Sequence, residues 1–161
     1  MQKNRSSKKP AGAKKRPVEK GSRGRVAARI LVVDDEVEFA SMIQRSLAGE
    51  GYRVDTALDG TSAIEQHRKH AYDLALVDLK MPDMTGLELL QYLKVRDKNI
   101  VVILMTAFGS LAVGIESLKK GAGDYLPKPF KLAALLVKVE EALRRRIRYL
   151  EEQVRSPVDE I

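Results

Sequence analysis

The chain contains no cysteine, which excludes disulfide bonds, thiolate metal sites and catalysis by a thiol. A chain without disulfides fits a reducing compartment, so we expect a cytoplasmic protein. Long apolar runs are also absent. The most apolar run, 100–105, is far shorter than the ~18 residues that a membrane-spanning helix needs. The basic N-terminus has no apolar stretch behind its charges, so we expect neither a membrane span nor a secretory signal.

Charge is distributed unevenly along the chain. The net charge of +7 combines +10 through Arg29, from eleven Lys or Arg and one acid, with −3 for the remainder. Residues 1–28 are rich in Lys, Arg, Ser, Gly and Pro and too polar to order themselves, so we expect a disordered basic arm. Such an arm either attracts nucleic acid, anionic lipid or another acidic partner, or is a solvated extension that aids solubility.

From residue 29 onward, five apolar segments of strand length alternate with five segments of helical spacing. This alternation predicts a three-layer α/β domain, with a five-stranded parallel sheet and helices on both of its faces. The domain is expected over 29–145, with a helical extension and tail over 146–161. The expected strands are 30–33, 52–56, 74–77, 100–105 and 124–126. The expected helices cover about 39–47, 61 onward, 86–95, 110–120 and 130–154.

Several residues predict where the helices begin and end. Ser62 with Glu65, and Thr85 with Glu88, have the spacing of a capping box, which would open the second and third helices. Pro157 is expected to stop the last helix, because proline lacks the backbone N–H that a helix interior requires.

Four of the expected strands are followed by a polar residue that can perform chemistry. These residues are Asp34 and Asp35, Asp78, Thr106 and Lys128. Ligands of an open parallel sheet bind beyond the carboxyl ends of the strands. If the strand order is 2-1-3-4-5, the three carboxylates converge there. Unpaired carboxylates at short range repel one another, and Mg²⁺, which takes oxygen ligands, removes that conflict.

The remaining two residues suit a phosphoryl group. Lys128 supplies a compact positive charge and Thr106 a hydroxyl donor, and both can neutralise the oxygens of a phosphoryl group in transfer. An aspartate carboxylate can act as the nucleophile and form an aspartyl phosphate. Asp78 lies between the acidic pair and the Thr106/Lys128 pair along the sheet edge, so the sequence predicts Asp78 as the acceptor.

Four segments of the chain resemble the receiver domain of two-component response regulators, over about 29–144. They are ILVVDDE, DLALVDLKMPDMTGLELL, VVILMTAFGS and GAGDYLPKPF. The last two are most similar to receivers of nitrogen-regulation-type transcriptional activators. The resemblance implies a flavodoxin-like fold, a bacterial phosphorelay, and a histidine kinase or histidine phosphotransfer protein that donates the phosphoryl group to Asp78. It also implies a phosphoacceptor that only dephosphorylates itself, and not an enzyme in the usual sense.

The same resemblance implies how Mg²⁺ is held. Asp35 is expected to bind the ion directly and Asp34 partly through water, with Asp78 and the backbone carbonyl of Lys80 completing the protein ligands. The backbone N–H of Ala107 would contact the phosphoryl group.

The resemblance also implies a conformational switch. Thr106 would move toward the phosphoryl group and Tyr125 would turn inward to fill the vacated space, which biases a two-state element. Tyr125 could equally be ordinary packing. Phe108 would partly screen the site from water, and we therefore expect a long-lived aspartyl phosphate.

The last expected helix has an apolar stripe that is longer than the sheet can cover. Its apolar stripe consists of Leu136, Val139, Leu143, Ile147, Leu150 and Val154. The part beyond Leu143 would be exposed on a monomer, so it either pairs in a homodimer or is a frayed amphipathic end. No P-loop pattern is present and few residues follow Arg144, so we expect a stand-alone receiver or part of a longer protein.

Two other functions remain as alternatives. An aspartyl-phosphate phosphatase could use a similar sheet, although such enzymes carry Asp-x-Asp after the first strand and this chain has Asp34-Asp35-Glu36. A nucleic-acid module could act through residues 1–28, alone or as part of a receiver. His67 and His70 are three apart on an expected helix, but without a third ligand we expect them to be solvated.

Overall fold

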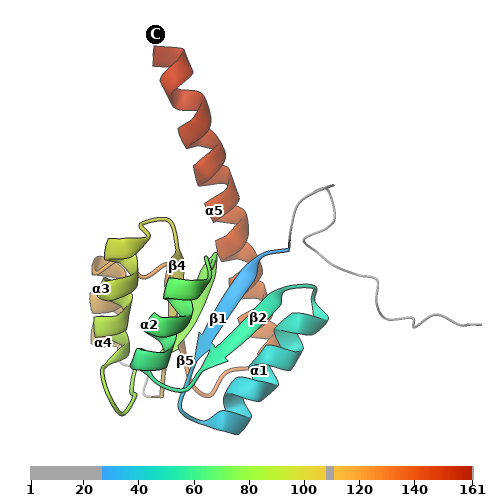
Figure 1. Ribbon diagram of the computed structural model, residues 1–161, viewed down its shortest axis with the longest axis vertical. Coiled ribbons are helices and arrows are strands. Elements are labelled where there is room, and N and C mark those ends of the chain that lie inside the picture. Colours follow the sequence, from blue (N-terminus) through green and yellow to red (C-terminus); the bar gives the residue numbers. More distant parts are fainter. Residues whose placement is uncertain (1–26, 108–110, 161) are drawn as a thin grey trace, which may run out of the picture.

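The computed structural model describes residues 27–107 and 111–160. Five parallel strands form one sheet in the order β2-β1-β3-β4-β5, which confirms the predicted order (Figure 1). The strands are β1 (Arg29–Val33), β2 (Arg53–Ala57), β3 (Leu74–Asp78), β4 (Val101–Thr106) and β5 (Asp124–Pro127). The helices are α1 (Val37–Gly49), α2 (Gly60–Lys69), α3 (Gly86–Arg96), α4 (Leu111–Lys119) and α5 (Leu132–Glu160).

Two apolar clusters, one on each face of the sheet, form the core. Alternate residues of a strand point to opposite faces. Accordingly Ile30 and Val32 belong to the cluster covered by α1 and α5, while Leu31 and Val33 belong to the cluster covered by α2 and α3. Helix α4 packs against β5, where Tyr125 lies against the second cluster. Strands buried on both faces explain why the sequence has continuous apolar runs instead of alternating ones.

The register of the sheet brings the carboxyl ends of its central strands together. Val33 of β1 lies beside Val77 of β3, and Asp78 of β3 lies beside Met105 of β4. Thr106 then pairs with Pro127 of β5. Each polar residue that follows these strands is therefore delivered to the same edge.

Two predictions about helix ends were wrong and one was confirmed. Thr85 and Glu88 do form a capping box at the start of α3. At α2, however, Asp59 is the N-cap and accepts a hydrogen bond from the backbone N–H of Ser62, so Ser62 is the third helical residue and not the cap. The helix begins before Ser62, and the Asp59 carboxylate caps it by accepting from the Ser62 N–H. Ser62 therefore lies inside the helix and cannot be its cap.

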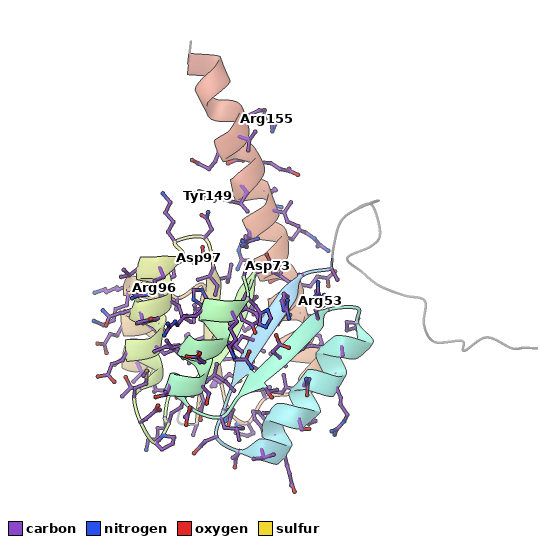
Figure 2. The ribbon with its side chains drawn as sticks, in the orientation of Figure 1. Arg53, Asp73, Arg96, Asp97, Tyr149 and Arg155 are labelled. Carbon is purple, nitrogen blue, oxygen red and sulfur yellow. The ribbon has the colours of Figure 1, made fainter. Side chains whose placement is uncertain are left out.

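The last helix also extends further than expected. α5 continues past Pro157 to Glu160. A proline removes one hydrogen bond and crowds the carbonyl four residues earlier, which can kink a helix without ending it. The helix crosses the proposed boundary at residue 145 without a break and projects beyond the sheet (Figure 1). Figure 2 shows Tyr149 and Arg155 on this projecting part. In the described part of the chain, no helix combines the length and apolar character needed to span a membrane.

Candidate functional site

Three carboxylates meet at the carboxyl ends of β1 and β3. One oxygen from each of Asp34, Asp35 and Asp78 lies within 4.8 Å of the others. Asp34 is fully buried, Asp78 is 7% exposed, and Asp35 faces solvent. Because strands β1 and β3 are neighbours in the sheet, residues 44 positions apart become direct neighbours at its edge. The predicted convergence of acids is therefore present.

Lys128 bridges this acidic group from the loop after β5. Its Nζ lies 2.9 Å from Asp34 Oδ2 and 3.6 Å from Asp78 Oδ1. The backbone N–H of Lys128 donates to the carbonyl of Thr106 at 2.6 Å, and its ammonium lies 4.4 Å from the centroid of the Phe39 ring. The ammonium is thus fixed from three sides and points at the two buried carboxylates.

The electrostatics of the site centre on Asp78. Burial, followed by the negative charge of Asp34, raises the pKa of Asp78 to about 6, and the positive charge of Lys128 opposes that rise. Burial alone would lower the pKa of Lys128, but its hydrogen bond to Asp34 and the charges of both aspartates raise that pKa above its ordinary value. One ammonium therefore does not fully neutralise the carboxylates, and an oxygen-seeking cation fits the remaining negative charge.

The backbone around the acidic group is closely packed. Asp34 Oδ1 accepts a hydrogen bond from the N–H of Glu36 at 2.9 Å, which orients the buried carboxylate. Behind Asp78, the start of α3 approaches so closely that a Cβ on Gly86 would lie 2.6 Å from the Asp78 carbonyl oxygen. The N–H of Gly86 donates to the carbonyl of Leu79 at 2.7 Å. A glycine is required there because any side chain would collide with the backbone at the end of β3.

A contact that the sequence analysis missed anchors the loop between β3 and α3. Asp83 Oδ1 accepts from the N–H of Gly60 at 2.9 Å, and Asp83 Oδ2 accepts from the N–H and hydroxyl of Thr61 at 2.8 and 2.6 Å. These hydrogen bonds lower the pKa of Asp83 to about 2, the one from the Thr61 hydroxyl contributing most. The partners are 22 or 23 residues apart, and no local pattern indicates such a pairing. Lys80 lies in the same loop, where its backbone pairs with Thr85.

The residues predicted to act as a switch lie on β4 and β5. Thr106 ends β4 and is 3% exposed. Tyr125 pairs in register with Leu104, and its half-buried ring lies against α4, where a Cβ on Gly114 would be 2.5 Å from the ring. Ala107 follows Thr106 and is exposed. Phe108 lies outside the described residues.

The histidines are not part of this site. The ring of His70 makes an edge contact with the ring of Tyr72, at a centroid distance of 6.2 Å. Within the ranges the structure describes, the only group of metal-binding side chains with suitable geometry is the three aspartates.

Comparison with known proteins agrees with this geometry. The family model of the response regulator receiver domain matches residues 30–140. The chain belongs to this family. The transcriptional regulatory protein ZraR of Klebsiella oxytoca is 42% identical over 114 residues, which are 71% of this chain and 26% of ZraR. TctD of Salmonella typhimurium (strain SL1344) is 38% identical over 117 residues, or 73% of this chain and 52% of TctD. The chain thus spans from about a quarter to about half of these relatives.

Solved receiver structures share the fold. A CheY-like receiver domain protein from Methanospirillum hungatei JF-1 superposes with a TM-score of 0.73 at 32% identity, covering 76% of this chain and 98% of that one. The receiver domain of NtrX from Brucella abortus gives 0.68 at 32% identity, covering 71% and 98%. The chain therefore has the receiver fold and fits two-component signalling, and its similarity to receivers of the nitrogen-regulation type is confirmed.

Proposed function

We propose that Asp78 of this receiver accepts a phosphoryl group from the phosphohistidine of a histidine kinase or histidine phosphotransfer protein. The observation that carries the proposal is the convergence of Asp34, Asp35 and Asp78 within 4.8 Å, bridged by the Lys128 ammonium. A lone acidic cluster would be weak support. The Lys128 ammonium beside Asp34 and Asp78 strengthens the proposal, because an acidic cluster alone suits a metal ion, whereas an added cation also suits phosphoryl oxygens.

In the proposed step, a carboxylate oxygen of Asp78 attacks phosphorus and the P–N bond of the phosphohistidine breaks. The bonding electron pair returns to the imidazole, which takes up a proton from water. Lys128 is 3.6 Å from the acceptor carboxylate, so its ammonium can contact an oxygen of the arriving group. We assign the Thr106 hydroxyl and the Ala107 N–H as further donors to these oxygens.

The metal ligands in this proposal are Asp34, Asp35, Asp78 and the backbone carbonyl of Lys80. Mg²⁺ would supply positive charge that neutralises the carboxylates and the transferring phosphoryl oxygens. The oxygen-only donor set and the incomplete neutralisation by Lys128 support this choice of ion.

Phosphorylation is proposed to act through Thr106 and Tyr125. A phosphoryl group on Asp78 adds acceptor oxygens near the end of β4, which would draw the Thr106 hydroxyl inward. Tyr125 packs against the small residue Gly114, so its ring can leave α4 without disturbing a large side chain. The two side chains together form the two-state element that the new charge biases.

The direct test is to treat the protein with a small phosphoryl donor and Mg²⁺ and to measure the intact mass. We expect one phosphoryl group per chain, none with Asp78→Asn, and undiminished labelling with the matched control Asp97→Asn, at the other end of the sheet. Labelling that survives Asp78→Asn would refute the assignment. Repeated turnover of a phosphate ester, without a stable labelled protein, would favour the phosphatase alternative.

A second proposal concerns output through α5. Ile147, Leu150 and Val154 line an open apolar groove on the projecting part of the helix, and Val154 is 75% exposed. A second copy of this helix is the occupant we propose, and a solved relative is described as a beryllofluoride-activated NtrC4 receiver domain dimer. Sizing the protein with and without beryllofluoride and Mg²⁺ tests whether activation changes the assembly. An unchanged monomer mass in both states would contradict it.

Two further parts of the proposal concern Phe108 and the basic arm, of which the structure describes only residues 27 and 28. The basic arm, residues 1–28, would bind nucleic acid or an acidic partner in the cytoplasm. Binding that is independent of sequence, falls with salt and disappears on deletion of the arm would support this role. Phe108 would slow self-dephosphorylation, so Phe108→Ala should release phosphate faster than the parent protein.

A further inference from the structure

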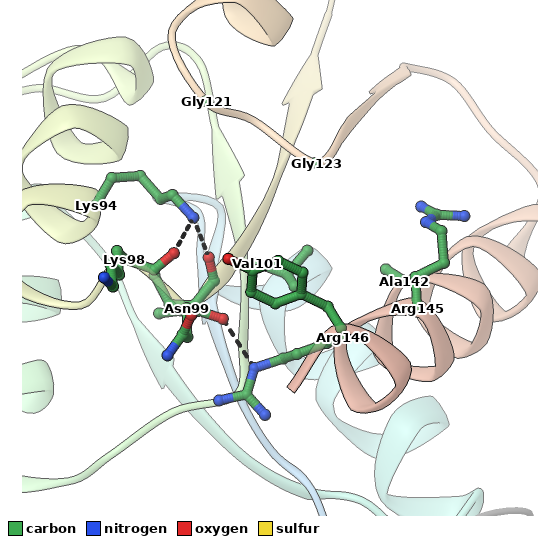
Figure 3. Close-up of a pocket in the computed structure, with 11 residues that line it drawn as sticks. Lys94, Lys98, Asn99, Val101, Gly121, Gly123, Ala142, Arg145 and Arg146 are labelled. Carbon is green, nitrogen blue, oxygen red and sulfur yellow. Dashed lines mark hydrogen bonds between the residues drawn. The ribbon is translucent and has the colours of Figure 1, made fainter. Parts of the chain in front are cut away.

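A second pocket lies at the opposite end of the sheet from Asp78. It is formed by the end of α3 and the loop into β4, by the turn between α4 and β5, and by the middle of α5 (Figure 3). Its volume is about 390 Å³, within the range of small-molecule sites. Gly121 and Gly123 form one wall, which brings the backbone itself to the pocket surface (Figure 3).

The lining of this pocket carries charge of one sign. Its cationic residues are Lys94, Lys98, Arg145 and Arg146, and no lining residue has a carboxylate. Asp73 pairs with Arg146 at 3.0 Å from outside the lining and neutralises one of the four charges. An excess of positive charge therefore remains around a small volume.

Lys94 differs from an ordinary surface lysine. Its ammonium is half-buried and donates to the carbonyl oxygens of Lys98 and Ile100, each at 2.8 Å (Figure 3). Among the described residues it forms no ion pair with a carboxylate. Burial lowers the pKa of Lys94, Asp97 opposes this effect, and the charge of Arg146 adds to it. The ammonium is thus held in place by neutral acceptors, and its charge is left without a bound counter-charge.

Arg146 is fixed in a similar way. Its Nε donates to the carbonyl of Asn99 at 2.8 Å (Figure 3). Asp73 pairs with the other end of the guanidinium. Two cations held by the fold lose little side-chain entropy when an anion binds, which favours affinity. Lys98 and Arg145 are exposed and can move toward a ligand. Tyr149 completes the lining and is 51% exposed.

We infer that this pocket binds the phosphate group of a nucleotide or of a nucleic-acid backbone. The terminal phosphate of a nucleotide carries nearly two negative charges and three acceptor oxygens, and a backbone phosphodiester carries one charge and two such oxygens. Either can accept charge-assisted hydrogen bonds from the cations that line one pocket. The exposed Tyr149 ring offers a stacking surface for a base. The site is independent of phosphoryl transfer, because it lies at the amino ends of the strands and contains none of the residues around Asp78.

The test is an NMR titration of the full chain with ADP, without divalent cations so that the aspartate site does not bind it. We expect the backbone amides of Gly121 and Gly123 to shift with saturation. The variant Lys98→Gln/Arg145→Gln should weaken binding by at least about tenfold, because two charge-assisted contacts are lost. Both side chains are exposed, so the variant is expected to fold. The matched control Arg45→Gln/Lys69→Gln removes the same charge from exposed helix positions outside the pocket lining and should bind as the parent does.

A parallel titration with a short DNA duplex distinguishes the two sources of phosphate. Saturable pocket shifts with ADP identify a nucleotide site, and shifts with the duplex alone identify a backbone phosphate. If Gly121 and Gly123 do not move with either probe, or if both double variants weaken binding equally, the inference is overturned. Equal weakening would mean that only the overall charge of the chain attracts the anion.

Discussion

Replacing Asp78 with Asn should stabilise the protein at neutral pH when no divalent cation is present. The pKa of Asp78 rises from its ordinary 3.8 to about 6, because burial and Asp34 disfavour the charged form more than Lys128 favours it. Two pKa units correspond to about 3 kcal/mol of free energy. Asn has nearly the same shape and no charge, so Asp78→Asn should raise the free energy of unfolding by about 2–3 kcal/mol.

The sign of the effect fixes its pH dependence. The folded state binds the Asp78 proton more tightly than the unfolded state does. The loss of stability caused by the Asp78 charge is therefore absent below pH 3.8 and complete above about pH 6. The free energy of unfolding of Asp78→Asn should therefore exceed that of the parent by almost nothing at pH 4 and by the whole difference of about 2–3 kcal/mol at pH 7.5. Adding Mg²⁺ should stabilise the parent more than the variant, because the proposed ion neutralises the charge that the variant lacks.

Urea unfolding followed by circular dichroism, at both pH values and with a chelator or Mg²⁺, measures all of these differences. Glu141→Gln removes an exposed charge from α5 and serves as the control, which should change stability little at either pH. If Asp78→Asn is destabilising without metal, or if its advantage does not change between pH 4 and pH 7.5, the charge of Asp78 is not the source of the penalty.

Three further substitutions test the packing around the site. Gly86→Ala should destabilise the protein by about 1–3 kcal/mol in urea unfolding, because its Cβ would meet the Asp78 carbonyl oxygen at 2.6 Å. Gly114→Ala would place a Cβ 2.5 Å from the Tyr125 ring and push the ring off α4, so beryllofluoride should bind severalfold more tightly, as measured by titration. Asp83→Ala should cost about 1–2 kcal/mol of stability at pH 7 and little at pH 2, where this carboxyl is half protonated.

Each of these substitutions has a result that would count against it. Gly49→Ala is the control for the first two, since a Cβ there meets nothing within 4 Å and should be neutral or stabilising. If Gly86→Ala is as stable to urea as Gly49→Ala, then α3 can shift to make room for the added Cβ and the close approach does not constrain it. Unchanged Tyr125 ring resonances in Gly114→Ala would refute the contact. A stability loss in Asp83→Ala that is equal at pH 7 and pH 2 would show that its charge does not matter.

The fold was largely predictable from local pattern. Continuous apolar runs such as 100–105 indicate strands buried on both faces, and their alternation with helical spacing leaves few topologies for a parallel sheet. The start of α2 was predicted to within one residue, but its cap was not: the Ser62 and Glu65 pair has capping spacing, whereas Asp59 occupies the cap. The local sequence contains more than one residue that could cap this helix, and the packing of the helix in the folded protein determines which of them does so.

The sequence by itself determined which residues follow the strands, and parallel-sheet geometry then required that Asp34, Asp78 and Lys128 share one edge. Only the tertiary structure decided that Lys128 contacts both carboxylates and that Asp83 holds the start of α2. It also decided that lysine and arginine side chains from α3, its following loop and α5 surround one pocket at the other end. The physical reason is that strand order follows from short-range periodicity, whereas contacts between loops depend on how whole helices pack.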